Sequence, residues 1–475
     1  MLFCGSSYSS HSGPGVVLSW RRAAATARAL GDRQLAKSKT SELDEIVRWD
    51  GPRTKDDTYG TIAERFLLMS LSHDDGVPAS LPHMAHDVEL AGAILIDLML
   101  YRRIRFQRGC VELTDGAPTG YAFLDPVLQK IEAESKTMEL GEWLELLAED
   151  SSDLKHAAFE RLADRGLVAV ERRALVSGFE AHFFPHAKDT GEESLVARIA
   201  CGDVLDPADV LAVCLANACG LFDVILSKKR KKRLAKRIRQ LVDTNVIGET
   251  MIEAVETASR ASRQDAERSI PPTTSKQSRQ SKKANKWEWR AFWSARRPVV
   301  TPGDAAGLDG SVEFKATNVS DRYLLIPERR DNIKMRKNGL EVKQLIESHR
   351  HYEAFRPKKV LKFPIEADDL ARIFPRLYGA SVKVSDKAEL EAALHTHGYV
   401  PTHVDVEKVR NRVRLVDDVL LEFCEFRVGN GTHWSVCVEG PDFGHVRAWV
   451  HTINPQAGQV MGYMDYLHQM VGEEC

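Results

Sequence analysis

The stretch NIKMRKNGLEVKQLIE, residues 332–347, alternates apolar and charged side chains on either side of Asn338-Gly339. An Asn-Gly pair between two alternating runs is a strong signal for a β-hairpin. Because successive side chains of a strand point to opposite faces, Lys334 and Arg336 share one face and the apolar residues share the other. The stretch therefore predicts a hairpin with one charged face, which meets either water or a bound ligand.

The same alternation recurs in the rest of the C-terminal part. Several of these segments carry Arg or Lys at every second position, and such rows would repel one another across an open face. Lining a closed barrel, they would surround a polyanion, with carboxylates available for a metal. The pattern predicts an α+β domain built on an antiparallel β-barrel, or tunnel. The segments are KWEWRAFW (286–293), VEKVRNRVRLV (406–416), LLEFCEFRV (420–428) and HWSVCVEG (433–440).

The chain of 475 residues has room for two or three domains. Residues 259–286 contain almost no apolar side chains and an excess of Lys and Arg, which predicts a flexible basic linker. Residues 1–45 are rich in Ser, Ala and Arg and are predicted to be a disordered extension, with an organelle presequence as the alternative. One domain is therefore placed at 46–258 and another at 287–475.

The domain at 46–258 is predicted to be mostly helical, with two β-hairpins. HDVELAGAILIDLMLYRR (86–103) is apolar nearly all round, which is typical of a central buried helix. The hairpins are expected at IRFQRGCVELT (104–114), turning at Arg108-Gly109, and at 167–185. The eight cysteines of the chain are scattered without a CxxC pair, so we expect buried thiols in a reducing compartment.

One helix of this domain carries most of its basic residues. In SKKRKKRLAKRIRQLV (227–242), Leu234, Ile238 and Leu241 share a face and cations cover the rest. Such a helix could lie on an anionic bilayer, at about 1 kcal/mol per cation near the surface, or bind nucleic acid. It could also be a solvated helix docked by its apolar stripe. The net charge of −2 means that any polyanion binding must be local. The candidate lipid contacts are Lys228, Lys229, Arg230, Lys231, Lys232 and Arg233.

Residues 58–257 resemble the Golgi phosphoprotein 3 family. The resemblance rests on LAGAILIDLMLYRRIRF, DGAPTGYAFLD, EWLELLAE and ERLADRGLVAVERR. It implies a compact helical domain that docks on membranes through phosphatidylinositol 4-phosphate, and a hairpin, here 167–185, that aids self-association. At the positions aligned with the headgroup pocket only Lys155 keeps a charge. We therefore expect a cytoplasmic, peripheral protein that binds anionic lipids with weak selectivity; no segment is long and apolar enough to span a bilayer.

Residues 286–475 resemble the CYTH family of triphosphate tunnel enzymes, on the opening strand, DRYLLIP, NIKMRKNGLEVKQL, VEKVRNRVRLV and HWSVCVEG. The resemblance implies an eight-stranded tunnel in which basic residues hold a triphosphate and glutamates hold magnesium or manganese. Carried over by position, the phosphate ligands are Lys334, Arg336, Lys343, Arg410 and Arg412. The metal ligands are Glu288, Glu425 and Glu439.

The first strand departs from the family pattern. The family opens on E-x-E-x-K, whereas this chain has Glu288-Trp289-Arg290-Ala291-Phe292, so an arginine replaces the second carboxylate. Divalent ions need oxygen ligands, and the change favours binding of a polyphosphate or nucleoside triphosphate over its turnover. No catalytic residue is assigned. The alternatives are a metal-dependent triphosphate hydrolase or cyclase of the CYTH type, and a barrel whose charges only pair internally.

Overall fold

The computed structural model groups the chain into two compact units. The first unit holds the described residues up to 167 and from 187 to 260, and the second holds residues 168–186 and those from 285 onward. Predictions for residues 1–45 and for 261–284 of the linker lie outside the described residues. The described residues are 60–71, 85–149, 151–176, 178–187, 195–243, 252–260, 285–303, 308, 312–327, 329–379, 383–456 and 458–473.

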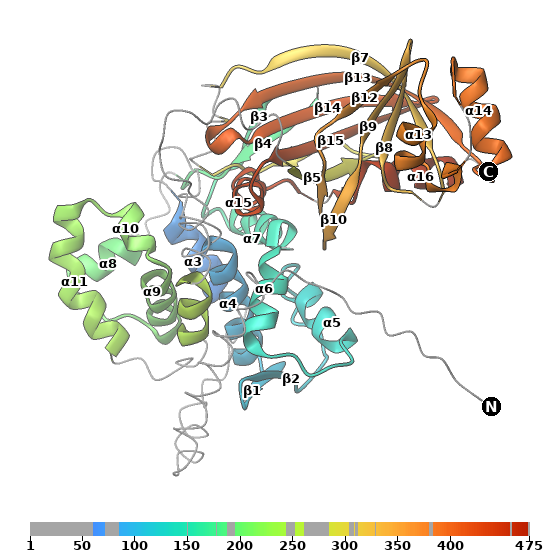
Figure 1. Cartoon of the computed structure of the whole chain (residues 1–475). Coiled ribbons are helices and arrows are strands. Elements are labelled where there is room, and N and C mark those ends of the chain that lie inside the picture. Colours follow the sequence, from blue (N-terminus) through green and yellow to red (C-terminus); the bar gives the residue numbers. More distant parts are fainter. Residues whose placement is uncertain are drawn as a thin grey trace, which may run out of the picture. The chain divides into compact units, whose positions relative to one another are not determined.

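The first unit is helical, as predicted, and contains one short hairpin (Figure 1). The hairpin turns at Arg108 and Gly109, both with positive φ, where the sequence places the turn. Residues 252–260 are also helical. The labelled elements are α3 (Ile62–Ser70), α4 (Ala85–Leu100), β1 (Ile104–Gln107), β2 (Cys110–Leu113), α5 (Asp125–Ala133), α6 (Leu140–Glu149), α7 (Ser151–Asp164), α8 (Leu195–Cys201), α9 (Pro207–Cys219), α10 (Leu221–Ile225) and α11 (Lys228–Asp243).

Helix α4 is the centre of this unit. It contacts α3, α6, α7 and α9, and its residues from Leu90 to Leu98 are buried on every side, which confirms the central helix predicted from its composition. Its one acid in that stretch, Asp97, caps α3: its carboxylate accepts hydrogen bonds from the backbone N–H of Ile62 (2.9 Å) and Ala63 (3.0 Å). Burial raises the pKa of Asp97 to about 7.

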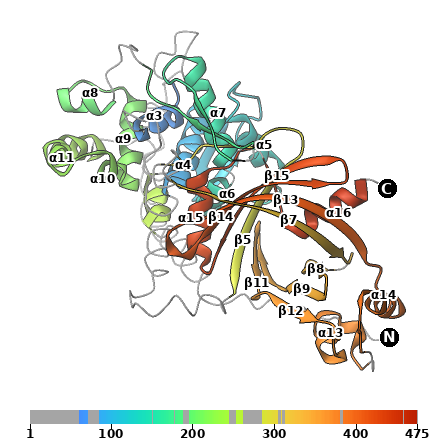
Figure 2. The same cartoon turned by 90° about the horizontal axis from the view of Figure 1, so that it is seen from above.

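The second unit is built on one curled, antiparallel, eleven-stranded sheet (Figures 1 and 2). The strands follow the order β10-β11-β5-β15-β14-β13-β7-β8-β9-β12, and β16 pairs with β5. The predicted antiparallel β fold is confirmed, in the form of a half-barrel: among the described strands, the path of paired strands ends at β10 and β12 and does not close into a tunnel. The strands are β5 (Lys286–Trp293), β7 (Lys315–Leu325), β8 (Asn332–Arg336), β9 (Gly339–Lys343), β10 (Leu345–His349), β11 (Tyr352–Phe355), β12 (Lys359–Lys362), β13 (Thr402–Arg414), β14 (Leu420–Val428), β15 (Gly431–Gly440) and β16 (Gln459–Val460).

Helices cover both faces of this sheet. On the convex side, α13 (Ala367–Ile373) and α14 (Lys387–Thr396) pack on β8 and β9, and α15 (Phe443–Ile453) packs on β5 and β15. On the concave side, α16 (Tyr463–Glu473) packs against β5, β7, β13 and β14. Two short 3-10 turns, Pro375–Leu377 and Val416–Asp418, complete the unit.

The hairpin of residues 332–347 forms as β8 and β9. Its two-residue turn is Lys337-Asn338, one residue earlier than the Asn-Gly pair predicts, and Gly339 already pairs with Arg336. Gly339 is needed for another reason: a Cβ on it would lie 1.8 Å from the carbonyl oxygen of Leu361 on β12. The apolar residues of the hairpin pack under α13 and α14, and its charged residues line the concave face. The charged face therefore looks inward.

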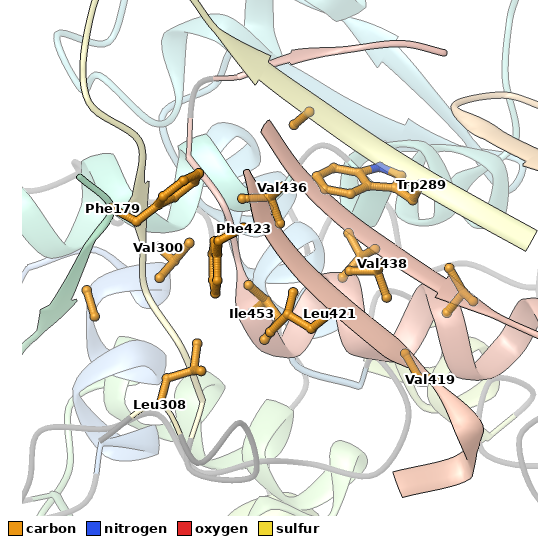
Figure 3. Packing of buried hydrophobic residues seen from close by; sticks show 14 of the residues in the cluster. Phe179, Trp289, Val300, Leu308, Val419, Leu421, Phe423, Val436, Val438 and Ile453 are labelled. Atoms are coloured by element: carbon orange, nitrogen blue, oxygen red, sulfur yellow. The ribbon is translucent and has the colours of Figure 1, made fainter. Parts of the chain in front are cut away.

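The hairpin predicted at 167–185 groups with the second unit, although the sequence places it within the first predicted domain. It forms β3 (Glu171–Ala174) and β4 (Glu180–Phe183), and β4 pairs in parallel with β6 (Val299–Val300). Phe179 packs on Phe423, with ring centroids 4.7 Å apart (Figure 3). Self-association through this hairpin stays a prediction. Within the chain, the apolar face of the hairpin is already buried in the core of the second unit, and the outer edge of β4 is already paired with β6.

We predict that Phe179→Ala lowers the free energy of unfolding of the second unit by about 3–5 kcal/mol, because it leaves a cavity against Phe423 and Trp293. Urea denaturation followed by tryptophan fluorescence measures the loss. Val170→Ala is the control: Val170 precedes the same hairpin and is 40% exposed, so its loss should cost about 0.5 kcal/mol or less. Equal stability of the two variants would contradict the assignment of the hairpin to this core.

Candidate functional site

The basic face of α11 is the first candidate site. Leu234, Ile238 and Leu241 are buried and hold the helix against the rest of its unit, including α8 and α9. The six predicted lipid contacts, Lys228 to Arg233, are all exposed. Lys231 pairs with Asp223 on α10. In the part of the chain that the structure describes, the other five have no acidic partner, and neither do Lys236 and Arg239.

Lys155, the remaining predicted lipid contact, is not at the surface. Its side chain is 8% exposed, and its Nζ lies 2.6 Å from Oδ1 of Asp87 on α4. A buried ammonium in an ion pair cannot reach a lipid headgroup without leaving an uncompensated carboxylate behind. The pocket position carried over from the family is thus occupied by a structural ion pair, and this prediction is corrected.

The concave face of the half-barrel is the second candidate site, and it has two halves. One half is apolar and covered by α16, whose Tyr466 stacks on Phe292 with centroids 4.0 Å apart. The other half carries charged side chains on strands: eight cations and six acids form its inner part, and the exposed Lys315, directly opposite Arg412 on β7, and Arg414 share the same face at its rim. The cations are Lys286, Arg290, Lys334, Arg336, Lys343, Lys408, Arg410 and Arg412, and the acids are Glu288, Asp321, Glu341, Glu353, Glu422 and Glu439. We call this set the charged half.

Asp321 is the hub of the charged half on β7, β8 and β13. Its fully buried carboxylate accepts hydrogen bonds from Lys334 Nζ (2.9 Å) and Arg336 Nη1 (2.7 Å). Lys408 Nζ lies 3.6 Å away and donates to the hydroxyl of Tyr323. Burial would raise the pKa of Asp321, but the lysines beside it hold that pKa well below its usual range. Two predicted phosphate ligands, Lys334 and Arg336, are therefore brought together here. They contact the carboxylate of Asp321, which the sequence analysis did not single out.

Lys408 is the most buried of these cations. Burial and the charge of Lys334 lower its pKa to about 7. Its ammonium lies 4.2 Å from the ring centroid of Tyr463 on α16, a cation–π contact. Sequence reasoning missed Lys408, although it stands two residues before Arg410 in the same alternating run.

A second network joins β5, β9, β14 and β15. Arg290 donates to Glu288 (2.9 and 3.0 Å) and lies 3.5 Å from Glu422. Glu422 also accepts from Arg410 Nε (2.7 Å). Burial would raise the pKa of Glu288, but Arg290 and Lys343 hold it well below its ordinary value. Arg290 is thus anchored between two acids.

Lys343 bridges two of the predicted metal ligands. Its Nζ lies 3.4 Å from Oε2 of Glu288 and 2.8 Å from Oε2 of Glu439, which are directly opposite one another on β5 and β15. Lys286 Nζ is 2.6 Å from the other oxygen of Glu439. The third predicted ligand, Glu425, is corrected: it lies on the convex face with Phe423, because the strand alternation turns it away from Glu422.

These residues do not fit a divalent cation. Both carboxylates that face one another already share an ammonium, and the third points to the other side of the sheet. Within the described ranges, no three His, Cys, Asp or Glu side chains gather in a group able to hold a metal ion.

Arg412 is the predicted phosphate ligand that stays available. It shares the concave face with Lys408 and Arg410, two and four residues away on β13, and it is half-buried. Glu422 lies directly opposite Arg412 on β14, but its carboxylate pairs with Arg410 and Arg290. Among the described residues, no acidic side chain forms an ion pair with Arg412.

Glu353 and Arg330 fasten α16 to the sheet. Arg330 donates to Glu353 Oε1 (2.8 Å) on β11 and to Asp465 Oδ1 (2.9 Å) on α16. Burial raises the pKa of Glu353 to about 7, despite the opposing charge of Arg330. Between pH 4.5 and 7 the folded protein therefore binds a proton that the unfolded chain has lost.

We predict that raising the pH through this window lowers the free energy of unfolding of the second unit, by up to about 3 kcal/mol from Glu353. Glu353→Gln removes the titrating group and should flatten this part of the pH profile, measured by urea denaturation at several pH values. Glu347→Gln, at an exposed position on β10, is the control and should keep the wild-type slope. A wild-type slope in Glu353→Gln would contradict the prediction.

The chain thus combines a helical unit with a second unit built on an antiparallel half-barrel. The family model of Golgi phosphoprotein 3 (GPP34) matches residues 62–260, so the N-terminal part is a Golgi phosphoprotein 3-like domain. The match covers the α11 face and less than half of the chain. A search of the curated proteins finds no match. The resemblance of residues 286–475 to the CYTH family stays a prediction.

Proposed function

We propose that this protein associates peripherally with anionic membranes through the basic face of α11. The observation that carries the proposal is the row of exposed cations on α11, most of which have no acidic partner among the described residues. The Golgi phosphoprotein 3-like domain that holds this helix supports the same kind of function. Among the described residues, no helix has both the length and the apolar character to cross a bilayer.

Electrostatics is expected to dominate this binding. The apolar stripe of α11 is buried in the fold, so it cannot insert into the acyl chains, and the cations contribute about 1 kcal/mol each near an anionic surface. Lys155 is held by Asp87 and adds no headgroup contact. We therefore expect weak selectivity among anionic headgroups and a steep decrease of binding with salt.

The test replaces Lys229, Lys232 and Lys236, which lie along one exposed side of α11, with glutamine. Removing three cations should weaken binding to vesicles of phosphatidylcholine and phosphatidylserine about 100-fold, measured by co-sedimentation. The control replaces the exposed Lys315, Lys337 and Lys362, which gives the same change in net charge on the other unit.

Two results would contradict this proposal. One is equal binding of the two triple variants, which would move the contact away from α11. The other is selective binding to phosphatidylinositol 4-phosphate at high salt, which would require a formed headgroup pocket. Binding to duplex DNA but not to vesicles would favour nucleic acid as the partner of the same face.

We propose as a second function that the charged half of the concave face binds a polyphosphate or a nucleoside triphosphate. The cations there outnumber the acids, and Arg412 has no acidic partner in the described chain. A phosphate-rich anion would neutralise this excess through charge-assisted hydrogen bonds. Turnover is expected to be poor, because Arg290 stands where the family has a carboxylate.

Arg412→Gln tests this second proposal. Loss of one charge-assisted contact, about 1.5–3 kcal/mol, should weaken tripolyphosphate binding about ten- to a hundredfold in calorimetry. Arg427→Gln is the matched control, because Arg427 is exposed on the opposite face of the neighbouring strand β14. Wild-type affinity in Arg412→Gln, or no tripolyphosphate binding by the wild type, would contradict the proposal.

A further inference from the structure

The carboxylates of Glu288 and Glu439 show a geometry that a metal site would use. They come from neighbouring antiparallel strands, they are directly opposite one another, and the two side chains are only 9% and 13% exposed. A pair of facing carboxylates at this depth needs a positive charge between them, because two buried anions would otherwise repel at short range.

Lys343 supplies that charge from β9. Its Nζ reaches Oε2 of both carboxylates, at 3.4 and 2.8 Å, and its side chain is 31% exposed. Arg290 and Lys286 contact the outer oxygens, Arg290 on Glu288 and Lys286 on Glu439. Three cations therefore contact these two anions, while a third acid, Glu353, lies directly opposite Glu288 on β11 and pairs with Arg330. A divalent ion entering between Glu288 and Glu439 would meet repulsion from the three cations.

We infer that the ammonium of Lys343 stands in for a divalent cation between Glu288 and Glu439, so that the concave face binds anions without any metal. Lys343, held from two sides and still partly exposed, can offer its remaining N–H bond to an anion. The part of this inference that concerns anions rests on the second proposed function. The part that concerns Lys343 and the two carboxylates does not.

The first experiment measures Mn²⁺ binding to the full chain by electron paramagnetic resonance. We expect no binding by the wild type that depends on Glu439. Lys343→Met removes the tethered cation and leaves the two carboxylates facing one another, so Mn²⁺ should bind at least about tenfold more tightly than to the wild type. Adding Glu439→Gln to Lys343→Met should abolish the gain.

Lys358→Met is the matched control. Lys358 also pairs with a concave-face acid, at 3.3 Å from Glu341, but its removal leaves no pair of facing carboxylates. It should therefore gain no Mn²⁺ site. An equal gain in both variants would overturn the inference, and so would Mn²⁺ binding by the wild type that Glu439→Gln removes. This wild-type measurement decides the question even if Lys343→Met fails to fold.

The second experiment measures tripolyphosphate binding by calorimetry with a chelator and with added Mn²⁺. We expect the same affinity in both conditions and a loss in Lys343→Met. Binding that requires Mn²⁺ would overturn the inference. If tripolyphosphate does not bind in either condition, the second proposed function fails, while the Mn²⁺ gain of Lys343→Met still tests the role of Lys343.

Discussion

The second unit depends on the division of each strand into an apolar and a charged side. On the convex face, apolar side chains are covered by α13, α14, α15 and the hairpin of β3 and β4. On the concave face, charges are buried next to opposite charges, with Asp321 as the hub for Lys334, Arg336 and Lys408. Since an unpaired buried charge is strongly destabilising, this face tolerates little change unless a ligand replaces the missing partner.

The covering of the convex face links distant parts of the sequence. Phe179 and Phe183 come from a segment that precedes the half-barrel by more than a hundred residues, yet they are buried in its core. Residues 287–475 alone therefore do not contain the whole hydrophobic core of the half-barrel. A boundary drawn along the sequence at the linker would remove part of its hydrophobic core, and the convex face would expose Trp293 and Phe423.

The two candidate sites use positive charge in different ways. The cations of α11 lie on the surface, where they are hydrated and can meet an extended anionic surface at little desolvation cost. The cations of the charged half are buried or half-buried and mostly paired with acids, which fixes their positions, and the ligand proposed for them is a compact anion. The two proposals thus assign ligands of very different shape to similar residue types on a helix and on a curled sheet.

Local patterns in the sequence determined much of this structure. The helical periodicity of 227–242 predicted which residues of α11 are buried, and the apolar run at 86–103 predicted the central helix α4. The alternation in 332–347 and 406–416 predicted that Lys334, Arg336, Arg410 and Arg412 share one face. These features depend on neighbours within one or two turns, or within one strand, which the sequence shows directly.

Only the tertiary structure decided which charges remain available. Lys155 and Lys343 are plain cations in the sequence, and each meets its acids through segments at least 55 residues away, Asp87 for the first and Glu288 and Glu439 for the second. The hairpin at 171–183 and the helix α16 likewise found their sites on the sheet through long-range packing. Charge pairing depends on distances of a few ångströms between residues far apart in the chain, and no local pattern encodes them.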